Sequence, residues 1–69
     1  MKIKGVANSA ALVELSSDEI RILNNALNEV CNGFSLEGEF DTRMGCTVDE
    51  ARHLLDEVNK LGKSIKNPN

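Results

Sequence analysis

Apolar residues recur at helical spacing in two stretches of this chain, residues 17–32 and 48–61. In the first stretch, the apolar positions that share one face are Ile20, Leu23, Ala26, Leu27, Val30 and Cys31. In the second stretch they are Val48, Ala51, Leu54, Leu55, Val58 and Leu61. A helical period places each set on one side of a helix, so the pattern predicts two helices whose apolar faces form the core.

Both predicted helices begin with a capping box. The two boxes are Ser16 with Glu19 and Thr47 with Glu50. In this arrangement the hydroxyl accepts a hydrogen bond from a free amide of the first turn, and the carboxylate accepts one from the amide of the cap residue. Gly33 and Gly62 are the expected ends of the two helices, because glycine readily adopts the left-handed conformation that terminates a helix.

The segments outside the helices are short. Residues 2–15 are expected to be extended, either as a β-hairpin turning near Asn8 or as an irregular arm. Residues 37–44 are expected to form a short helical turn, and residues 63–69 a frayed tail. We therefore predict one small α+β domain that is mostly α. In it, an N-terminal β-hairpin or extended arm precedes two capped helices joined by a short helical linker.

Composition and charge narrow the functional classes. The 69 residues carry eleven acidic side chains against eight basic ones, a net charge of −3 that argues against non-specific binding to nucleic acid or an anionic membrane. Phe34 and Phe40 are the only aromatic residues, so no stacking platform for bases is expected. Cys31 and Cys46 cannot make a disulfide framework. No apolar run is long enough for a signal peptide or a membrane span, and we expect a cytoplasmic protein.

No catalytic, metal or cofactor site is predicted, and no small-molecule substrate is indicated. Asp49 and His53 are spaced to share a hydrogen bond and, with Cys46 or Cys31, resemble a nucleophile, a base and an orienting acid. A chain this short supplies neither an oxyanion site nor a pocket of useful size for that chemistry. The cysteine and histidine spacings also match no zinc pattern. We therefore expect that the protein is not an enzyme.

Residues 43–55 resemble the turn and recognition helix of bacterial helix-turn-helix regulators, with Gly45 at the turn. Asp41 departs from that pattern, because those proteins usually place a small residue there. The start of the second helix carries Asp49 and Glu50, which DNA phosphates would repel. The sequence is therefore consistent with a degenerate helix-turn-helix whose charge disfavours DNA binding.

Asparagine side chains crowd one side of the first predicted helix. Because asparagine is a mediocre helix former, several on one face suggest a use other than solubility. The candidate partner-binding face consists of Arg21, Asn24, Asn25, Asn28, Glu29 and Asn32 on the first helix with Asp49, Glu50 and His53 on the second. The alternative is that these are solvated positions with no role in binding, since surfaces tolerate many substitutions.

Two functional hypotheses follow. The preferred one is a non-enzymatic protein–protein interaction module that binds another protein, or itself as a homodimer, through its acidic and Asn-rich faces. The size and charge would suit an acidic inhibitor of the immunity-protein or antitoxin type, because complementary charge speeds association with a basic toxin. A small regulator would also fit. The alternative hypothesis is a helix-turn-helix transcriptional regulator that binds nucleic acid.

Two runs of the sequence carry a family resemblance, LNNALNEVCNG at residues 23–33 and EFDTRMG at residues 39–45. Together with the Glu-Ala and Leu-Leu pairs of the second predicted helix, they resemble a group of small bacterial proteins for which no activity is established. The resemblance covers residues 15–61. It implies a bacterial cytosolic protein in which the asparagine strip and the linker belong to a shared scaffold.

Overall fold

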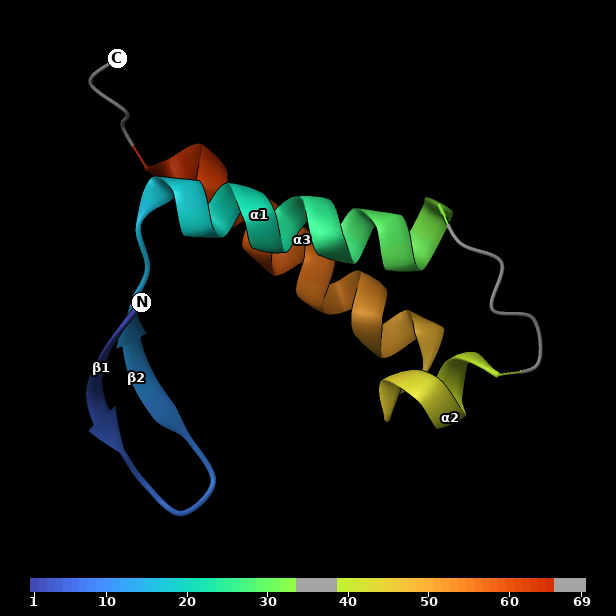
Figure 1. Cartoon of the computed structure of the whole chain (residues 1–69), viewed down its shortest axis with the longest axis horizontal. Helices are drawn as coiled ribbons and strands as arrows, with labels where there is room; N and C mark the ends of the chain where they lie inside the picture. Colours follow the sequence, from blue (N-terminus) through green and yellow to red (C-terminus); the bar gives the residue numbers. More distant parts are fainter. Residues whose placement is uncertain (34–38, 66–69) are drawn as a thin grey trace.

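The computed structural model describes residues 1–33 and 39–65 and confirms a mostly α, α+β fold (Figure 1). The elements in chain order are strands β1 (Lys2–Val6) and β2 (Ala11–Glu14), then helix α1 (Ser17–Asn28), the π-helical turn η1 (Glu29–Gly33), the short helix α2 (Phe40–Met44) and helix α3 (Val48–Ser64). The N-terminal segment is a hairpin and not an irregular arm. The first two residues of the predicted linker turn and the last four of the predicted tail lie outside the described residues.

Both predicted capping boxes are confirmed. The Ser16 hydroxyl accepts a hydrogen bond of 3.1 Å from the amide of Glu19, and the Ser16 amide donates one of 2.9 Å to the Glu19 carboxylate. Thr47 and Glu50 make the same two hydrogen bonds, with the same lengths. Each box satisfies amides that a helix leaves free at its start, so local sequence is enough to position the first turns of α1 and α3.

The left-handed conformation expected at Gly33 and the helix end expected at Gly62 are both wrong. Gly33 has no positive φ and closes the π-helical turn η1, where a Cβ would collide with the Glu29 carboxylate. Gly62 lies inside α3, which continues to Ser64, and a Cβ on Gly62 would lie 3.5 Å from Cγ2 of Ile20. Packing against α1 supports this last turn and outweighs the helix-ending tendency of glycine. Among the described glycines, only Gly45 has a positive φ, of 71°.

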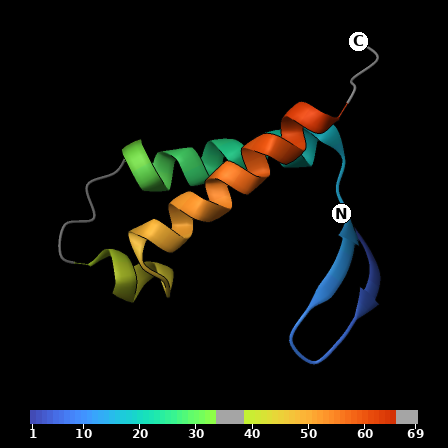
Figure 2. The same cartoon turned by 180° about the vertical axis from the view of Figure 1, so that it is seen from behind.

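Helices α1 and α3 cross as an antiparallel pair, which both views show (Figures 1 and 2). Gly62 of α3 lies near Ile20 at the start of α1, while Cys31 at the end of the first helical segment packs with Ala51 and Leu55. The buried core consists of Ile20, Cys31, Ala51 and Leu55. Leu27, Phe40 and Cys46 are partly buried against it, so the linker helix α2 is held to the core mainly through Phe40.

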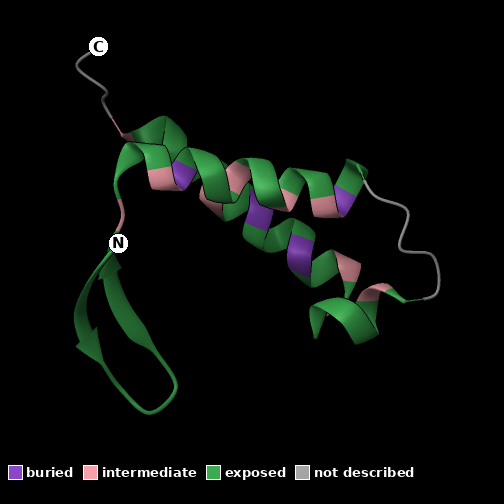
Figure 3. Ribbon diagram, viewed as in Figure 1, coloured by how far each residue is buried: buried purple, intermediate pink, exposed green. Residues whose placement is uncertain are grey.

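Four side chains predicted to point into the core are instead exposed. They are Leu23, Ala26, Leu54 and Leu61. The physical reason is the shape of the molecule: two crossed helices cover only a narrow strip of each other, and the hairpin does not cover the rest (Figure 3). Each predicted apolar stripe thus has two buried, two half-buried and two exposed positions.

The hairpin projects from the start of α1, and every residue of its two strands is exposed (Figures 1 and 3). A hydrogen bond of 2.8 Å from the amide of Ala7 to the carbonyl of Ala10 closes the turn between the strands. The chain is consequently open: its radius of gyration is 13.8 Å, whereas a compact domain of this length is expected to have about 11 Å. Within the described residues, no helix combines the length and the apolar character needed to cross a membrane.

Candidate functional site

The crossed pair of α1 and α3 has two chemically different faces. Successive residues turn by about 100° around a helix axis, and in an antiparallel pair equal offsets from the buried line fall on the same side. The apolar face, to one side of that line, carries Leu23 and Ala26 of α1 with Leu54 and Leu61 of α3. The amide face, to the other side, carries Arg21, Asn25 and Asn28 of α1, Asn32 of η1, and Asn59 and Lys63 of α3.

A groove of about 310 Å³ lies on the amide face, between the first half of α1 and the second half of α3. Its polar lining residues include Asp18, Arg21, Asn24, Asn59 and Lys63. Amide groups and charges of both signs offer donors and acceptors side by side, which suits hydrogen bonding to a peptide better than binding of an apolar ligand. The contribution of α3 to this groove is absent from the sequence-based face.

Hydrogen bonds already engage part of the amide face. Asn32 donates through Nδ2 to Oδ1 of Asn28 at 3.0 Å, and Arg21 donates to the Asp18 carboxylate at 3.4 Å. The buried Oδ1 of Asn24 has no hydrogen-bond partner among the described residues. A buried acceptor without a donor is unfavourable, so Asn24 is a position where a donor from water or a partner would be stabilising.

The remaining residues of the predicted face are not gathered with the asparagines. Glu29 lies on the side of its helix turned away from the core, and Asp49 and His53 lie on the outer side of α3. The expected pairing of Asp49 with His53 gives way to one between His53 and Glu57, whose side chains approach to 3.7 Å. The Glu50 carboxylate already serves the capping box. The structure thus assembles Arg21 with the asparagines and leaves the acidic residues of α3 apart.

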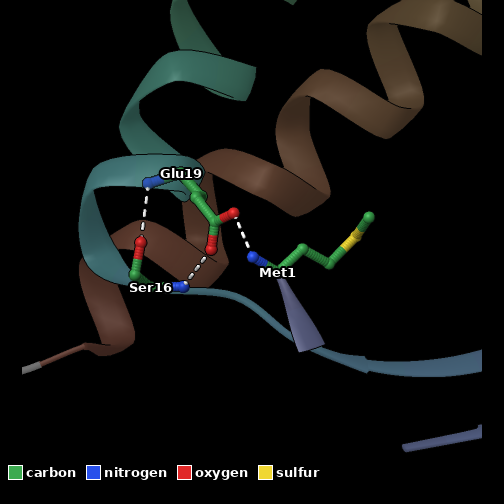
Figure 4. Close-up of polar contacts among 3 residues, drawn as sticks. All are labelled: Met1, Ser16 and Glu19. Atoms are coloured by element: carbon green, nitrogen blue, oxygen red, sulfur yellow. Dashed lines mark hydrogen bonds and ion pairs between the residues drawn. The ribbon is translucent and has the colours of Figure 1, made fainter. Parts of the chain in front are cut away.

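Glu19 lies where the hairpin meets the helices (Figure 4). Its carboxylate accepts hydrogen bonds from the ammonium of Met1 and from the amide of Ser16. These donors favour the ionised form, with the ammonium contributing most, and lower the pKa of Glu19 to about 2. The pKa of Glu50 is also lowered, first by the amide of Thr47. Glu19 therefore joins the two parts of the molecule as well as capping α1.

The hairpin has an apolar side of its own. Ile3 pairs with Val13 and Gly5 pairs with Leu12, so Lys4 is the extra residue of a β-bulge. The bulge shifts the alternation by one residue. It thereby places four residues on one side, the hairpin apolar face: Ile3, Val6, Ala11 and Val13. The opposite side carries Lys2, Lys4, Leu12 and Glu14, with Lys4 and Glu14 3.4 Å apart.

The sequence alone did not predict this face, because apolar residues do not alternate regularly along β1. One local signal could have revealed it. A glycine inside a strand often marks a bulge, and Gly5 directly follows the extra residue Lys4. Allowing one inserted residue there puts Ile3 and Val6 on a common side.

The remaining candidate chemistry concerns the two cysteines and the side chains that could bind a metal ion. Cys31 is buried and Cys46 is half-buried, and both are free thiols. Within residues 1–33 and 39–65, no three His, Cys, Asp or Glu side chains gather closely enough to hold a metal ion. Comparison with models of protein families, with curated proteins and with solved structures finds no match to this chain.

Proposed function

We propose that this protein is a non-enzymatic protein–protein interaction module. The observation that carries the proposal is the apolar surface left uncovered on the helix pair and on the hairpin. Among the described residues only four side chains are buried, whereas Leu54 is 50% exposed and Val6 is 77% exposed. Contiguous exposed apolar surface is uncommon in monomers and usually marks a site where another molecule binds.

The amide face supports the same proposal in a different way. Its groove presents donors and acceptors side by side, together with the Asn24 carbonyl oxygen, which has no hydrogen-bond partner in the described part of the chain. A polar segment of a partner could bind there, between the two helices. The net charge of −3 favours a basic partner, since opposite charge speeds encounter. A cytoplasmic setting is in keeping with two free thiols.

A nucleic-acid-binding regulator is the second candidate, and one observation favours it. Gly45 ends α2 in the left-handed conformation and leads into α3, as the turn of a helix-turn-helix would. Two features weigh against it. Leu54, which such a motif would place inward, is exposed, and the first turn of α3 is acidic, with Asp49 and Glu50. Specific DNA binding would need contacts to phosphate groups, and the acidic first turn of α3 would repel those groups.

The test is cross-linking in the organism that encodes the chain, followed by recovery of a tagged copy and mass spectrometry. The wild type is compared with Leu54→Glu, which alters the apolar face, and with Asn25→Arg, which alters the amide face. Ile22→Glu is the matched control, because Ile22 is 60% exposed and lies outside the apolar face. We expect a cross-linked protein partner that at least one face variant loses and the control retains.

Recovery of the tagged chain only as a monomer would overturn the proposal. Retention of mixed-sequence duplex DNA at low salt, lost as salt is raised, would support the regulator instead. The expected result is no retention even at low salt.

A further inference from the structure

The hairpin is well formed, and none of the described elements packs extensively on its apolar face. A two-stranded hairpin is at best marginally stable in water by itself. Here its contacts are mainly internal, and Ile3 and Val6 are 64% and 77% exposed. The pairing nevertheless places four apolar side chains on one side and all three charged side chains, together with Leu12, on the other. An antiparallel sheet with one covered face has a similar arrangement.

The apolar face of the helix pair is also uncovered, since no second layer packs on it within the described residues. A domain of this type normally buries the apolar stripe of each helix against a second layer. Leu23, Leu54 and Leu61 remain 41%, 50% and 44% exposed. The hairpin apolar face and the apolar face of the helix pair each consist of four apolar residues, so each could cover the other and exclude water from it.

A chain's own hairpin is poorly placed to cover its own helices. The extended backbone of Ser16 directs the hairpin away from the start of α1 (Figures 1 and 2), and the contact of Met1 with Glu19 holds its base there. Leu54 lies in the N-terminal half of α3, towards the far end of the pair. Folding the hairpin back would require breaking the capping box or the Met1–Glu19 contact.

Charge favours a second copy as the partner. Residues 1–14 carry two lysines against one glutamate, whereas residues 15–69 carry ten acidic side chains against six basic ones. The two segments therefore carry net charges of opposite sign, +1 and −4, which attract the hairpin of one copy to the helices of another.

The surface area also matches. The chain exposes 5686 Å², roughly a third more than the about 4,200 Å² expected for a compact monomer of its mass. This excess exceeds the roughly 800 Å² that each partner contributes to an interface of standard size.

We infer that the protein forms a reciprocal homodimer in which the hairpin of each copy lies on the apolar face of the helix pair of the other. The inference rests on the proposed interaction function and names its partner. A two-fold axis makes both contacts equivalent, which closes the assembly and leaves both amide faces free for a further protein.

The first experiment measures the mass of the purified chain by light scattering over a dilution series. The wild type is expected to be a dimer at micromolar concentration. Val6→Glu and Leu54→Glu should each raise the dimer dissociation constant at least tenfold, because each buries a charge in an apolar contact. Two controls should change it less than about twofold: Leu12→Glu, at a 69% exposed residue on the other side of the hairpin, and Ile22→Glu.

A mixing experiment tests the reciprocal geometry. When Val6→Glu and Leu54→Glu chains are combined, a mixed dimer regains one intact contact, formed by the normal hairpin of one chain and the normal helices of the other. Mixing should therefore restore a dimer that neither variant forms alone. Far-UV circular dichroism checks that both variants keep their helices, which is expected because neither residue is buried.

Each other outcome overturns the inference. A wild type that is monomeric throughout the series overturns dimerisation, and dimerisation without recovery on mixing overturns the reciprocal contact in favour of hairpin-to-hairpin pairing. Cellular cross-linking separates the two proposals. Capture of a different protein by a monomeric chain leaves the interaction function standing without this inference, whereas a chain that captures nothing and stays monomeric overturns both.

Discussion

The helix pair and the hairpin are stabilised in different ways. In residues 1–33 and 39–65, all four buried side chains belong to the helical part of the chain, and each long helix starts at a complete capping box. The hairpin has neither a buried side chain nor a capping box, since every residue of its strands is exposed. Besides the chain itself, the contact of Met1 with Glu19 links it to the helices. Both nevertheless have one apolar and one polar side.

This difference shows that amphipathic pattern and burial are separate properties. The helix pair uses half of its apolar surface to hold itself together, and the other half remains available. The hairpin holds its shape through backbone pairing and one turn, while all of its apolar side remains available. An amphipathic element whose apolar side is exposed is therefore a candidate for contact with another molecule.

The largest contrast between the regions should come from removing one leucine from each. Leu55→Ala is expected to lower the free energy of unfolding by about 2–4 kcal/mol, because Leu55 is 9% exposed in the small core with Cys31 and Ala51. Leu12→Ala, on the charged side of the hairpin, should change it by less than about 0.5 kcal/mol. Urea unfolding followed by circular dichroism measures both changes in stability. Equal effects would contradict the distinction between a stabilising helical core and an exposed hairpin.

The starts of the helices could be predicted from sequence, because their causes are local. Ser16, Thr47 and the glutamates three residues after each act within one turn, so no knowledge of the rest of the fold is needed. The hairpin turn is also local. The asparagine strip could likewise be placed on one side of α1 by spacing alone.

Properties that depend on neighbours distant in sequence could not be predicted. Leu23 and Leu54 were predicted to be buried, because the sequence of one helix does not show how much of its surface the neighbouring helix will cover. Gly62 was predicted to end its helix, because its proximity to Ile20 depends on how the two helices pack. The groove required Asn59 to meet Asn24 from another element. Of the residues that line the groove, Arg21 and Asn24 were therefore named from the sequence, whereas Asn59 and Lys63 of α3 were not.

A capping substitution should destabilise the helices and leave the hairpin paired. Thr47→Ala removes the hydroxyl that accepts the hydrogen bond from the amide of Glu50, and is expected to cost about 1 kcal/mol of stability. Thr47→Ser keeps the hydroxyl and is the matched control. Hydrogen exchange of the backbone amides should accelerate in α3, while exchange in β1 and β2 stays unchanged. Faster exchange in both regions would mean that the hairpin depends on α3.

Two glycines allow the helix pair to be strengthened or weakened without touching the hairpin. Gly62→Ala is expected to raise stability by about 0.5–1 kcal/mol, because alanine is the better helix former and its Cβ would meet Ile20 at an ordinary contact distance of 3.5 Å. Gly45→Ala should lower stability by about 1 kcal/mol, since a φ of 71° strains a residue with a side chain. Thermal unfolding distinguishes the two by opposite shifts in midpoint.

The smallest effect concerns acid, and it tests the junction between the two regions. The lowered pKa of Glu19, about 2 against an ordinary 4.5, means that its ionised form stabilises the folded state above pH 4.5. That contribution should disappear as the pH falls from 4.5 towards 2, since the unfolded chain takes up the proton first.

The comparison of Glu19→Gln with Glu50→Gln separates the junction from the capping. Glutamine can still accept the hydrogen bond from the cap residue's amide, so both helices should keep their starts. Urea unfolding at several pH values should show a shallower loss of stability in acid for Glu19→Gln than for Glu50→Gln, because only Glu19 also binds the Met1 ammonium. Equal slopes would mean that the ammonium contributes nothing, and that the hairpin and the helices are joined by the chain alone.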